Sequence, residues 1–359
     1  EERAAGMSDE LIEQEFFCFP PGTMIWTSVG QKPIEQINEN DIVLTHAGRW
    51  RKVTKTHERW FDGHLIKLTS AGSCKKLSCT PEHPVRVCDP WKQTYRWVQA
   101  DDVTENDYVV LPRIKTAGFS VVSEEIIELL AWFITEGSVS KNHVQFSLSK
   151  NEVAVAKRLV AIGSKFGKAW SLENRTALNV GINSCKLADF LVSHCGSGAA
   201  NKRIPWSLIS GNESAFYELL LDGDGCRGDY SGATEVYTTI SYGLALDVQM
   251  LAHLLGRAAL VYSSKHDLCV IEGRLCNASD SYSVHIKRPE ALKRGRLVRP
   301  QKHGVATKVR KIEKERYSGP VYNFSVQYDE SYVADGRVVH NCSWTYGLEG
   351  AYYLKQISK

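Results

Sequence analysis

Residues 338–343 read Val-Val-His-Asn-Cys-Ser and place His340, Asn341 and Cys342 in a row. The side-chain amide nitrogen of an Asn can attack its own backbone carbonyl, close a succinimide and cut the peptide bond that follows. A neighbouring Cys thiol is a good nucleophile that can receive an acyl group. Because such a triplet also occurs by chance, its meaning depends on a matching site elsewhere in the chain.

A matching site lies upstream at Cys18, in the string Phe-Cys-Phe-Pro-Pro-Gly-Thr. The Cys18 thiol can attack the carbonyl of Phe17 and turn the amide into a thioester, provided that the leaving nitrogen is protonated. Thr80 and His83 lie three residues apart in Thr-Pro-Glu-His. A hydroxyl and an imidazole at this spacing can both reach one peptide bond, and His is the usual acid or base near neutral pH.

With these motifs the chain resembles an intein. Inteins begin with Cys or Ser, carry a Thr-x-x-His motif, and end in an apolar stretch closed by His-Asn and then Cys, Ser or Thr. The stretches 321–326 and 331–341 reproduce that ending. The resemblance covers residues 18–341 and implies an all-β, horseshoe-like splicing domain of the hedgehog/intein type.

The resemblance also implies a splicing mechanism that needs no cofactor. Cys18 forms the thioester with help from Thr80 and His83, and Cys342 then takes over the acyl group. Asn341 cyclises with help from the neighbouring imidazole, which releases the intein and joins the flanks.

Two positions depart from the intein pattern. Where inteins often carry an Asp and, seven residues later, a His, this chain has Asn323 and Glu330. An Asn cannot act as a general acid or base, so one helper of the thioester steps is expected to be missing. Glu330 is the candidate to take over proton transfer.

Composition is that of a globular protein, with 359 residues, 43% hydrophobic and 24% charged. The sequence has no run of 18 apolar residues, so it predicts no membrane-spanning helix. Ten cysteines without regular spacing favour reduced thiols and a cytoplasmic location. A zinc site is the alternative for one cluster, but its spacing fits no paired pattern; its residues are Cys74, Cys79, His83 and Cys88.

The chain is long enough for more than one domain. Short strands are predicted before residue 110 and again from 308 to 339, which gives a β domain from 18–115 and 305–341. The interruption, residues 116–304, instead predicts helices with apolar periodicity at 124–133, 151–167 and 244–255.

Two apolar helices in this insertion each end in an acidic residue and a Gly. They end at Glu136 and Asp224, which are 224 − 136 = 88 residues apart and indicate an internal duplication. Side by side, the two carboxylates would repel each other, and Mg²⁺ relieves such repulsion and can activate water. The pair resembles the motifs of a LAGLIDADG homing endonuclease, whose third motif position is usually small; Ala131 fits that pattern and Leu219 does not.

A homing endonuclease implies double-stranded DNA as partner, with the target in the uninterrupted host gene and the protein a monomer. The segment 285–316 holds twelve Lys and Arg against three Asp and Glu, in a chain of net charge +3. The flanks, 1–17 and 342–359, contain Gln-Glu-Phe-Phe at 14–17 and Gly-Ala-Tyr-Tyr at 350–353. When joined they resemble the large terminase subunit of tailed phages, which implies the cytoplasm of a phage or prophage host.

Three alternatives stay open at this point. A hedgehog-like autoprocessing domain would share Cys18, Thr80 and His83 but would not need the His-Asn-Cys ending. A splicing-only intein could carry a decayed insertion that cuts nothing. The insertion could also bind DNA without a metal and without catalysis.

Overall fold

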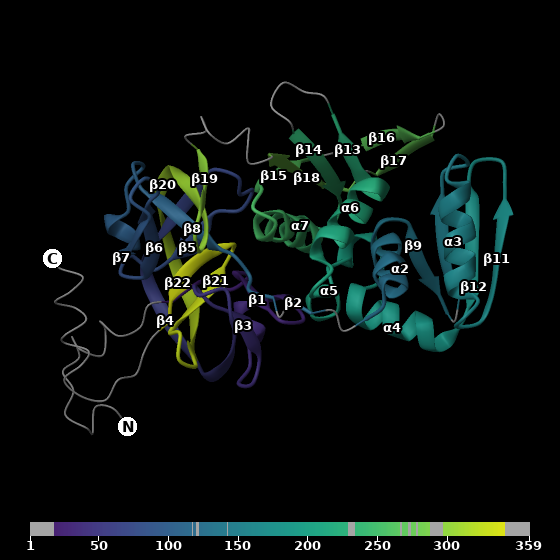
Figure 1. The fold of residues 1–359 in the computed structure, drawn as a ribbon. Helices are drawn as coiled ribbons and strands as arrows, with labels where there is room; N and C mark the ends of the chain where they lie inside the picture. The colour runs from purple at the N-terminus through teal and green to yellow at the C-terminus, as the bar shows by residue number, and fades with distance from the viewer. Residues whose placement is uncertain are drawn as a thin grey trace. The chain divides into compact units, whose positions relative to one another are not determined.

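The structure, a computed structural model, describes residues 18–116, 118–119, 122–141, 143–228, 234–265, 268–271, 274–277, 279–287 and 297–341. The chain divides into two compact units (Figure 1). The first comprises residues 1–115 and 289–359, and the second comprises 116–288. The flanks 1–17 and 342–359, with Phe17 and Cys342, lie outside the described residues.

The first unit consists almost entirely of strands, as the sequence predicts. Its elements are β1 (Met24–Thr27), β2 (Gly30–Pro33), η2 (Ile34–Gln36), β3 (Ile42–Leu44), β4 (Trp50–Ser70), β5 (Leu77–Cys79), β6 (Pro84–Asp89), β7 (Thr94–Gln99), η3 (Ala100–Asp102), β8 (Tyr108–Pro112), β19 (Val298–Gln301), β20 (Gly304–Val326), β21 (Ser331–Ala334) and β22 (Arg337–His340).

Strands from both ends of the chain alternate in one antiparallel sheet of this unit. The hydrogen-bonded order runs β19-β20-β8-β6-β22-β21-β1-β3-β4-β5, and β4 pairs in addition with β20, so the path closes on itself. Figure 1 shows the purple amino-terminal strands beside the yellow carboxy-terminal ones. Cys18 and Asn341 can therefore lie in one domain although they are 341 − 18 = 323 residues apart in sequence.

The strand β19 corrects the domain boundary that the sequence suggested. It pairs with β20 from Val298↔Thr307 to Gln301↔Gly304, so it belongs to the first unit and not to the insertion. Its sequence, Val-Arg-Pro-Gln, has no clear period-2 pattern, and only the pairing with a neighbouring strand identifies it as a strand.

The second unit alternates helices and strands. Its elements are α2 (Glu124–Thr135), β9 (Gly137–Ser140), β10 (His143–Leu148), α3 (Val153–Gly163), β11 (Lys168–Glu173), β12 (Leu178–Asn183), α4 (Cys185–Cys195), η4 (Ala199–Asn201), α5 (Trp206–Ile209), α6 (Glu213–Asp224), β13 (Gly225–Arg227), β14 (Thr234–Thr239), α7 (Tyr242–Leu254), β15 (Ala258–Ser264), β16 (Leu268–Ile271), β17 (Arg274–Asn277) and β18 (Ser281–Lys287). Among the described residues, no helix has the length and apolarity to cross a bilayer.

The two halves of this unit repeat one topology. The first half has the order helix, two strands, helix, two strands, and its sheet runs β9-β10-β12-β11. The second half follows the same plan from α6, apart from the added β16–β17 hairpin, and its sheet runs β13-β14-β18-β15. In both sheets the strands therefore lie in the order first, second, fourth, third, which supports the internal duplication inferred from the two acid-Gly helix ends.

The first helices of the two halves, α2 and α6, pack against each other. A Cβ at Gly223 would lie within 2.7 Å of the Thr135 side chain, so only Gly allows this approach. The sequence had located the small motif residue at Ala131 and found none at Leu219. The small residue in α6 that faces the partner helix is Gly223, four positions later and one helical turn nearer its end.

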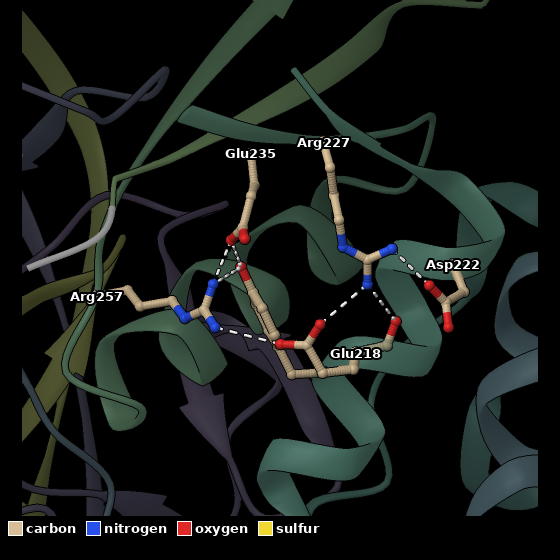
Figure 2. Close-up of polar contacts among 6 residues, drawn as sticks. Glu218, Asp222, Arg227, Glu235 and Arg257 are labelled. Carbon is tan, nitrogen blue, oxygen red and sulfur yellow. Dashed lines mark hydrogen bonds and ion pairs between the residues drawn. The ribbon is translucent and has the colours of Figure 1, made fainter. Parts of the chain in front are cut away.

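A charged network fastens α6 to the strands of its own half (Figure 2). Arg227 on β13 binds Glu218 and Asp222 of α6, at 3.0 and 2.5 Å. Arg257 joins Glu218, at 3.2 Å, to the buried Glu235 of β14. Glu235 is the buried carboxylate of this network, and its contact with the Arg257 guanidinium offsets part of its desolvation cost.

Candidate functional site: two junctions on one strand

Thr80 holds the upstream junction from both sides of Cys18. The Cys18 backbone nitrogen, which is the leaving atom in thioester formation, donates to Thr80 Oγ1 at 3.1 Å. The Thr80 nitrogen in turn donates to the Cys18 carbonyl at 3.0 Å. Thr80 directly follows β5 and is fully buried, so its hydroxyl has a fixed position beside the Cys18 nitrogen.

His83 lies in the same turn as Thr80. Its nitrogen donates to the Thr80 carbonyl at 3.1 Å, and its carbonyl accepts from Ala100 at 2.9 Å. The imidazole is fully buried, and its ring centroid lies 4.3 Å from that of Phe19, at 60°. The Thr-x-x-His spacing therefore brings both predicted helpers to the residues around Cys18, with the Pro81-Glu82 pair forming the turn between them.

The thiol of Cys18 has a neighbour that sequence reasoning missed. Burial raises the pKa of the Cys18 thiol, whereas Arg59, which hydrogen-bonds it, lowers that pKa. Arg59 lies on β4 opposite Val321 of β20, while Phe19 bridges Tyr322 on the other side of β20. Only the closed sheet brings Arg59 to Cys18, so no local spacing could reveal it.

Asn323 is a buried hydrogen-bonding residue at this junction. Its Oδ1 accepts from the Tyr332 hydroxyl at 2.6 Å and from the Phe324 nitrogen at 2.7 Å. An amide oxygen with two donors is well placed to orient its neighbours, but it cannot exchange protons. That a helper of the thioester steps is missing here stays a prediction.

The downstream junction depends on a two-residue turn. Asp335 and Gly336 join β21 to β22 with φ of 43° and 79°, the left-handed values of a type I′ hairpin turn. This turn fixes the register that places Ser331 opposite His340. The Asp-Gly pair in the sequence is the typical signal for such a turn, so the position of the reacting end follows from local chemistry.

Asn341 is buried and held by the backbone of the preceding loop. Its nitrogen donates to the Glu330 carbonyl at 3.0 Å. With the side-chain amide oriented to satisfy both neighbours, its nitrogen donates to the same carbonyl at 2.7 Å and its oxygen accepts from Val326 at 2.9 Å. Glu330 therefore contacts Asn341 through its backbone carbonyl, and proton transfer by its carboxylate stays a prediction.

His340 contacts the carbonyl that Asn341 would attack. Its Nδ1 lies 2.6 Å from the Asn341 carbonyl oxygen, so a proton on Nδ1 would polarise that carbonyl. Burial lowers the pKa of His340, the hydrogen bond to Asn341 and the Glu330 carboxylate raise it, and Arg86 lowers it. The imidazole is therefore mainly neutral at pH 7 and donates through Nδ1.

One strand, β20, anchors both junctions. Tyr322 pairs with Phe19 beside the upstream junction, and Val326 binds the side chain of Asn341 at the downstream one. Four residues along a strand span about 13 Å, so the two sites are close enough for a short movement of the flanks to connect them.

The alternative zinc site is not assembled. Among the described residues, no three His, Cys, Asp or Glu side chains gather in a way that could hold a metal ion. Burial raises the pKa of the Cys79 thiol well above its usual range and that of Cys88 to about 12, which disfavours the thiolates that zinc requires.

In the second unit, Glu136 and Asp224 lie at the ends of the packed helices α2 and α6, as the sequence predicts. Burial raises the pKa of Glu136 to about 7, and the Asp224 and Glu152 charges add to this. Burial also raises the pKa of Asp224 to about 6, although a hydrogen bond of 3.3 Å from Tyr237 opposes this. Carboxylate oxygens are hard donors, and ionising both carboxyls together is unfavourable. A divalent cation would offset that cost, so the pair suits such an ion.

The chain has relatives in several organisms. It is 28% identical to an iron-sulfur cluster assembly SufBD family protein of Mycobacterium tuberculosis, over 91% of this chain and 43% of the relative. It is 27% identical to the ATP-dependent DNA helicase Hel308 of Thermococcus kodakarensis, over 94% of this chain and 37% of that protein. The chain thus spans less than half the length of these relatives. Neither is a terminase, and the terminase resemblance of the flanks stays a prediction.

Solved structures similar to this chain include two kinds of protein. A variant of the Ssp DnaB mini-intein matches over 91% of this chain and 99% of its own, with 7% identity and a TM-score of 0.34. I-DmoI in complex with DNA and manganese matches over 47% of this chain and 92% of its own, with 14% identity and a TM-score of 0.33.

A family model identifies the family of this chain. The model of the intein splicing domain matches residues 21–341, which includes both strand-rich segments and the insertion between them. The match ends at Asn341, the residue that the sequence predicts at the downstream junction. The chain belongs to the intein splicing domain family.

Proposed function

We propose that this protein excises itself from its flanks by splicing, with Cys18, Cys342 and Asn341 as the reacting residues. The observation that carries the proposal is the pairing of each junction with a hydrogen-bonding helper. Thr80 contacts the upstream leaving nitrogen, and His340 contacts the downstream carbonyl. No single-junction autoprocessing domain would need both.

In the first step, the Cys18 sulfur forms a bond to the Phe17 carbonyl carbon and the bond to the Cys18 nitrogen breaks. A proton leaves the thiol and a proton reaches the nitrogen, on the side where Thr80 and His83 lie. Cys342 then takes over the acyl group, and cyclisation of Asn341 cuts the bond before Cys342. The freed thioester on Cys342 then rearranges: the Cys342 nitrogen bonds to the acyl carbon, the bond from that carbon to sulfur breaks, and a peptide bond results.

The test uses two precursors with complete flanks. We expect Cys18→Ala to leave only cleavage after Asn341, and Asn341→Ala to leave only thiol-induced cleavage before Cys18. Gel electrophoresis and mass spectrometry distinguish the fragments from the ligated flanks. If either variant still gives ligated product, the assignment of the reacting residues is wrong.

We also propose that the insertion is a DNA endonuclease of the LAGLIDADG type that uses Mg²⁺. The supporting observation is the convergence of Glu136 and Asp224 at the ends of two packed helices in a duplicated fold. Their carboxylates would hold Mg²⁺, and oxygens of a DNA phosphate would supply the remaining ligands. The bound ion would stabilise the charge on the phosphate and activate water.

The sheets of the insertion offer a polar face for DNA. In the first sheet α3 covers one face, where Gly163 packs on Ile182 and Ala169. The opposite face carries amides, hydroxyls and rings that suit base edges and phosphates. These are Ser138, His143, Gln145, Ser147, Trp170, Asn179 and Asn183.

The basic segment 285–316 contributes less than its composition suggests. Within the described part of this segment, three cations are paired with acids, Lys311 with Glu313, Lys314 with Asp101 and Arg316 with Asp62. Others are stacked on rings, since Arg299 lies 4.9 Å from the Trp91 centroid and Lys308 lies 5.5 Å from that of Tyr108. Stacked cations beside an exposed Trp remain suited to a nucleic acid.

The endonuclease test replaces both Glu136 and Asp224 by Ala. We expect the unmodified protein to cut DNA of the uninterrupted host gene with Mg²⁺, and the double variant to bind the same DNA without cutting it. Replacing Glu152, a more distant carboxylate, by Ala is the control and should leave cutting in place. Undiminished cutting by the double variant would place the metal site elsewhere, whereas absence of both binding and cutting in the unmodified protein would favour a decayed insertion.

A further inference from the structure

His340 has an aromatic neighbour that the splicing motifs do not include. The ring centroid of Trp97 lies 5.0 Å from that of His340, with the planes nearly perpendicular at 83°. Trp97 belongs to β7, which is paired with β6 over six residues. A rigid ring at this distance limits the orientations of the imidazole, while Nδ1 of that imidazole points to the Asn341 carbonyl.

Arg86 stacks on Trp97. The two residues lie directly opposite each other in the β6–β7 ladder, and the guanidinium carbon is 5.1 Å from the Trp97 centroid. The same carbon is 5.1 Å from the centroid of Tyr95, two residues along β7. Cation–π contacts of this length hold a permanent positive charge behind the ring that packs on His340.

The charged and titratable groups around His340 come from three elements. Arg86 lies on β6, Glu330 precedes β21, and His46 lies between β3 and β4. Nδ1 of His46 contacts the hydroxyl of Ser331 at 2.6 Å, and Ser331 faces His340 across the hairpin.

Burial and Arg86 lower the pKa of His46 to about 4; beyond these, Asp329 raises it while His340 and Arg49 lower it. His46 is therefore neutral at pH 7. Two charged groups then act on the pKa of His340 in opposite directions, since Glu330 raises it and Arg86 lowers it.

We propose that Trp97 and Arg86 are positioning residues for the Asn341 step. Trp97 aims the His340 imidazole at the Asn341 carbonyl, and Arg86 opposes the formation of a second cation there. This inference rests on the proposed splicing function and deepens it.

The two residues act on the rate in opposite directions. In the step, a bond forms between the Asn341 side-chain nitrogen and its own carbonyl carbon, and the bond to the Cys342 nitrogen breaks. One proton leaves the attacking nitrogen and one reaches the leaving nitrogen. A cationic imidazole is the stronger proton donor for both oxygen and nitrogen. Trp97 therefore speeds the step at every pH, whereas Arg86 slows it near neutral pH.

The experiment measures cleavage after Asn341 from about pH 5 to pH 9, the range in which histidine titrates. Every precursor carries Cys18→Ala, which confines the chain to this step. We expect Trp97→Ala to slow cleavage by on the order of tenfold across the range, and Trp97→Phe to keep most of the rate. Arg86→Met should cleave several-fold faster near neutral pH. Without the Arg86 charge, His340 keeps its proton to a higher pH, so the rate begins to fall at a higher pH than in the parent. Arg86→Lys, which keeps the charge, should follow the parent.

Two controls separate this effect from a general loss of structure. Trp60 is 68% exposed on β4, and Arg96 is the neighbour of Trp97 on β7 and binds Asp107 at 2.7 Å. Trp60→Ala and Arg96→Met should both leave the profile unchanged. If Trp97→Ala does not fold, as thermal unfolding would reveal, the two Arg86 variants still decide the proposal.

The failure of this inference is distinguishable from failure of the splicing function. A Cys18→Ala parent that never cleaves after Asn341 would contradict splicing itself. If the parent cleaves, and Trp97→Ala and Arg86→Met both show the same rate and pH profile as the parent, only the roles of Trp97 and Arg86 are overturned.

Discussion

At the scale of single residues, the chemistry was largely legible in the sequence. Cys18, Thr80, His83, His340 and Asn341 lie in three short motifs, and the structure brings Thr80 to the Cys18 nitrogen and His340 to the Asn341 carbonyl. The residues that sequence reasoning missed share one property, which is that they reach a junction across the sheet from a distant strand. They are Arg59, Arg86 and Trp97.

His83 is predicted to assist the upstream step and not the downstream one. It lies in one turn with Thr80 and packs on Phe19, next to Cys18. In a chain with Asn341→Ala, we expect His83→Ala to slow thiol-induced cleavage by about 10²-fold, a usual contribution of a general acid. In a chain with Cys18→Ala, the same replacement should leave cleavage after Asn341 intact. Equal slowing of both steps would indicate a structural role.

Metal binding by the insertion is predicted to strengthen as pH rises. The raised pKa values of Glu136 and Asp224, about 7 and about 6, mean that both carboxyls hold protons in mildly acidic solution. Mg²⁺ binds the ionised forms, so protons compete with it. The stabilisation of the insertion by Mg²⁺, measured as a shift in its thermal unfolding, should be small near pH 5 and large near pH 8.

The same titration has a second consequence with the opposite sign. Without metal, the folded insertion holds more protons than the unfolded chain, whose carboxyls ionise near pH 4. Its stability should therefore fall as pH rises from about 4 through about 7. A Glu136→Gln, Asp224→Asn variant should lose both dependences. A Mg²⁺ effect that stays the same at all pH values would argue against these two ligands.

At the scale of helices and strands, type was easier to predict than register. The helix predicted at 124–133 is α2, and the one predicted at 244–255 is α7, which begins at Tyr242 behind its cap Ser241. The helix predicted from 151 begins at Val153, because Ser149 and Glu152 hydrogen-bond each other before it. The strand β19 and the approach at Gly223 depend on partners distant in sequence, so periodicity could not reveal them.

Gly223 is predicted to control the packing of α2 on α6. A Cβ there would clash with Thr135, so Gly223→Ala should destabilise the insertion by about 1–3 kcal/mol and separate Glu136 from Asp224. Gly243→Ala is a matched control in α7, because its Cβ meets nothing closer than 3.8 Å and alanine favours a helix. Urea unfolding of the two variants checks the contrast. Equal stability of both would contradict the close approach.

At the scale of the whole molecule, the sequence indicated a β domain interrupted by an α/β insertion, and its motifs located both reacting ends. It did not show that the sheet closes through β4 and β20. That closure joins residues from 309 − 70 = 239 to 326 − 53 = 273 positions apart, roughly two domain lengths, and depends on pairings that no local pattern encodes. Because this sheet closes without any strand of the insertion, removing the insertion breaks none of its pairings.

Splicing is predicted to survive deletion of the insertion. The Arg113 nitrogen donates to the His303 carbonyl at 3.2 Å, and Pro112 pairs with Gly304, so the two ends of the gap are neighbours within the first unit. A short flexible linker from Lys115 to Leu297 leaves every strand of that unit in place, β19 included. We expect the shortened precursor to give ligated flanks on a gel while losing Mg²⁺-dependent DNA cutting. The same deletion in a Cys18→Ala chain should give only cleavage after Asn341. That result would show that ligation by the shortened precursor still depends on Cys18. A shortened chain that folds cooperatively yet yields no ligated product would mean that the insertion is needed to hold the junctions together.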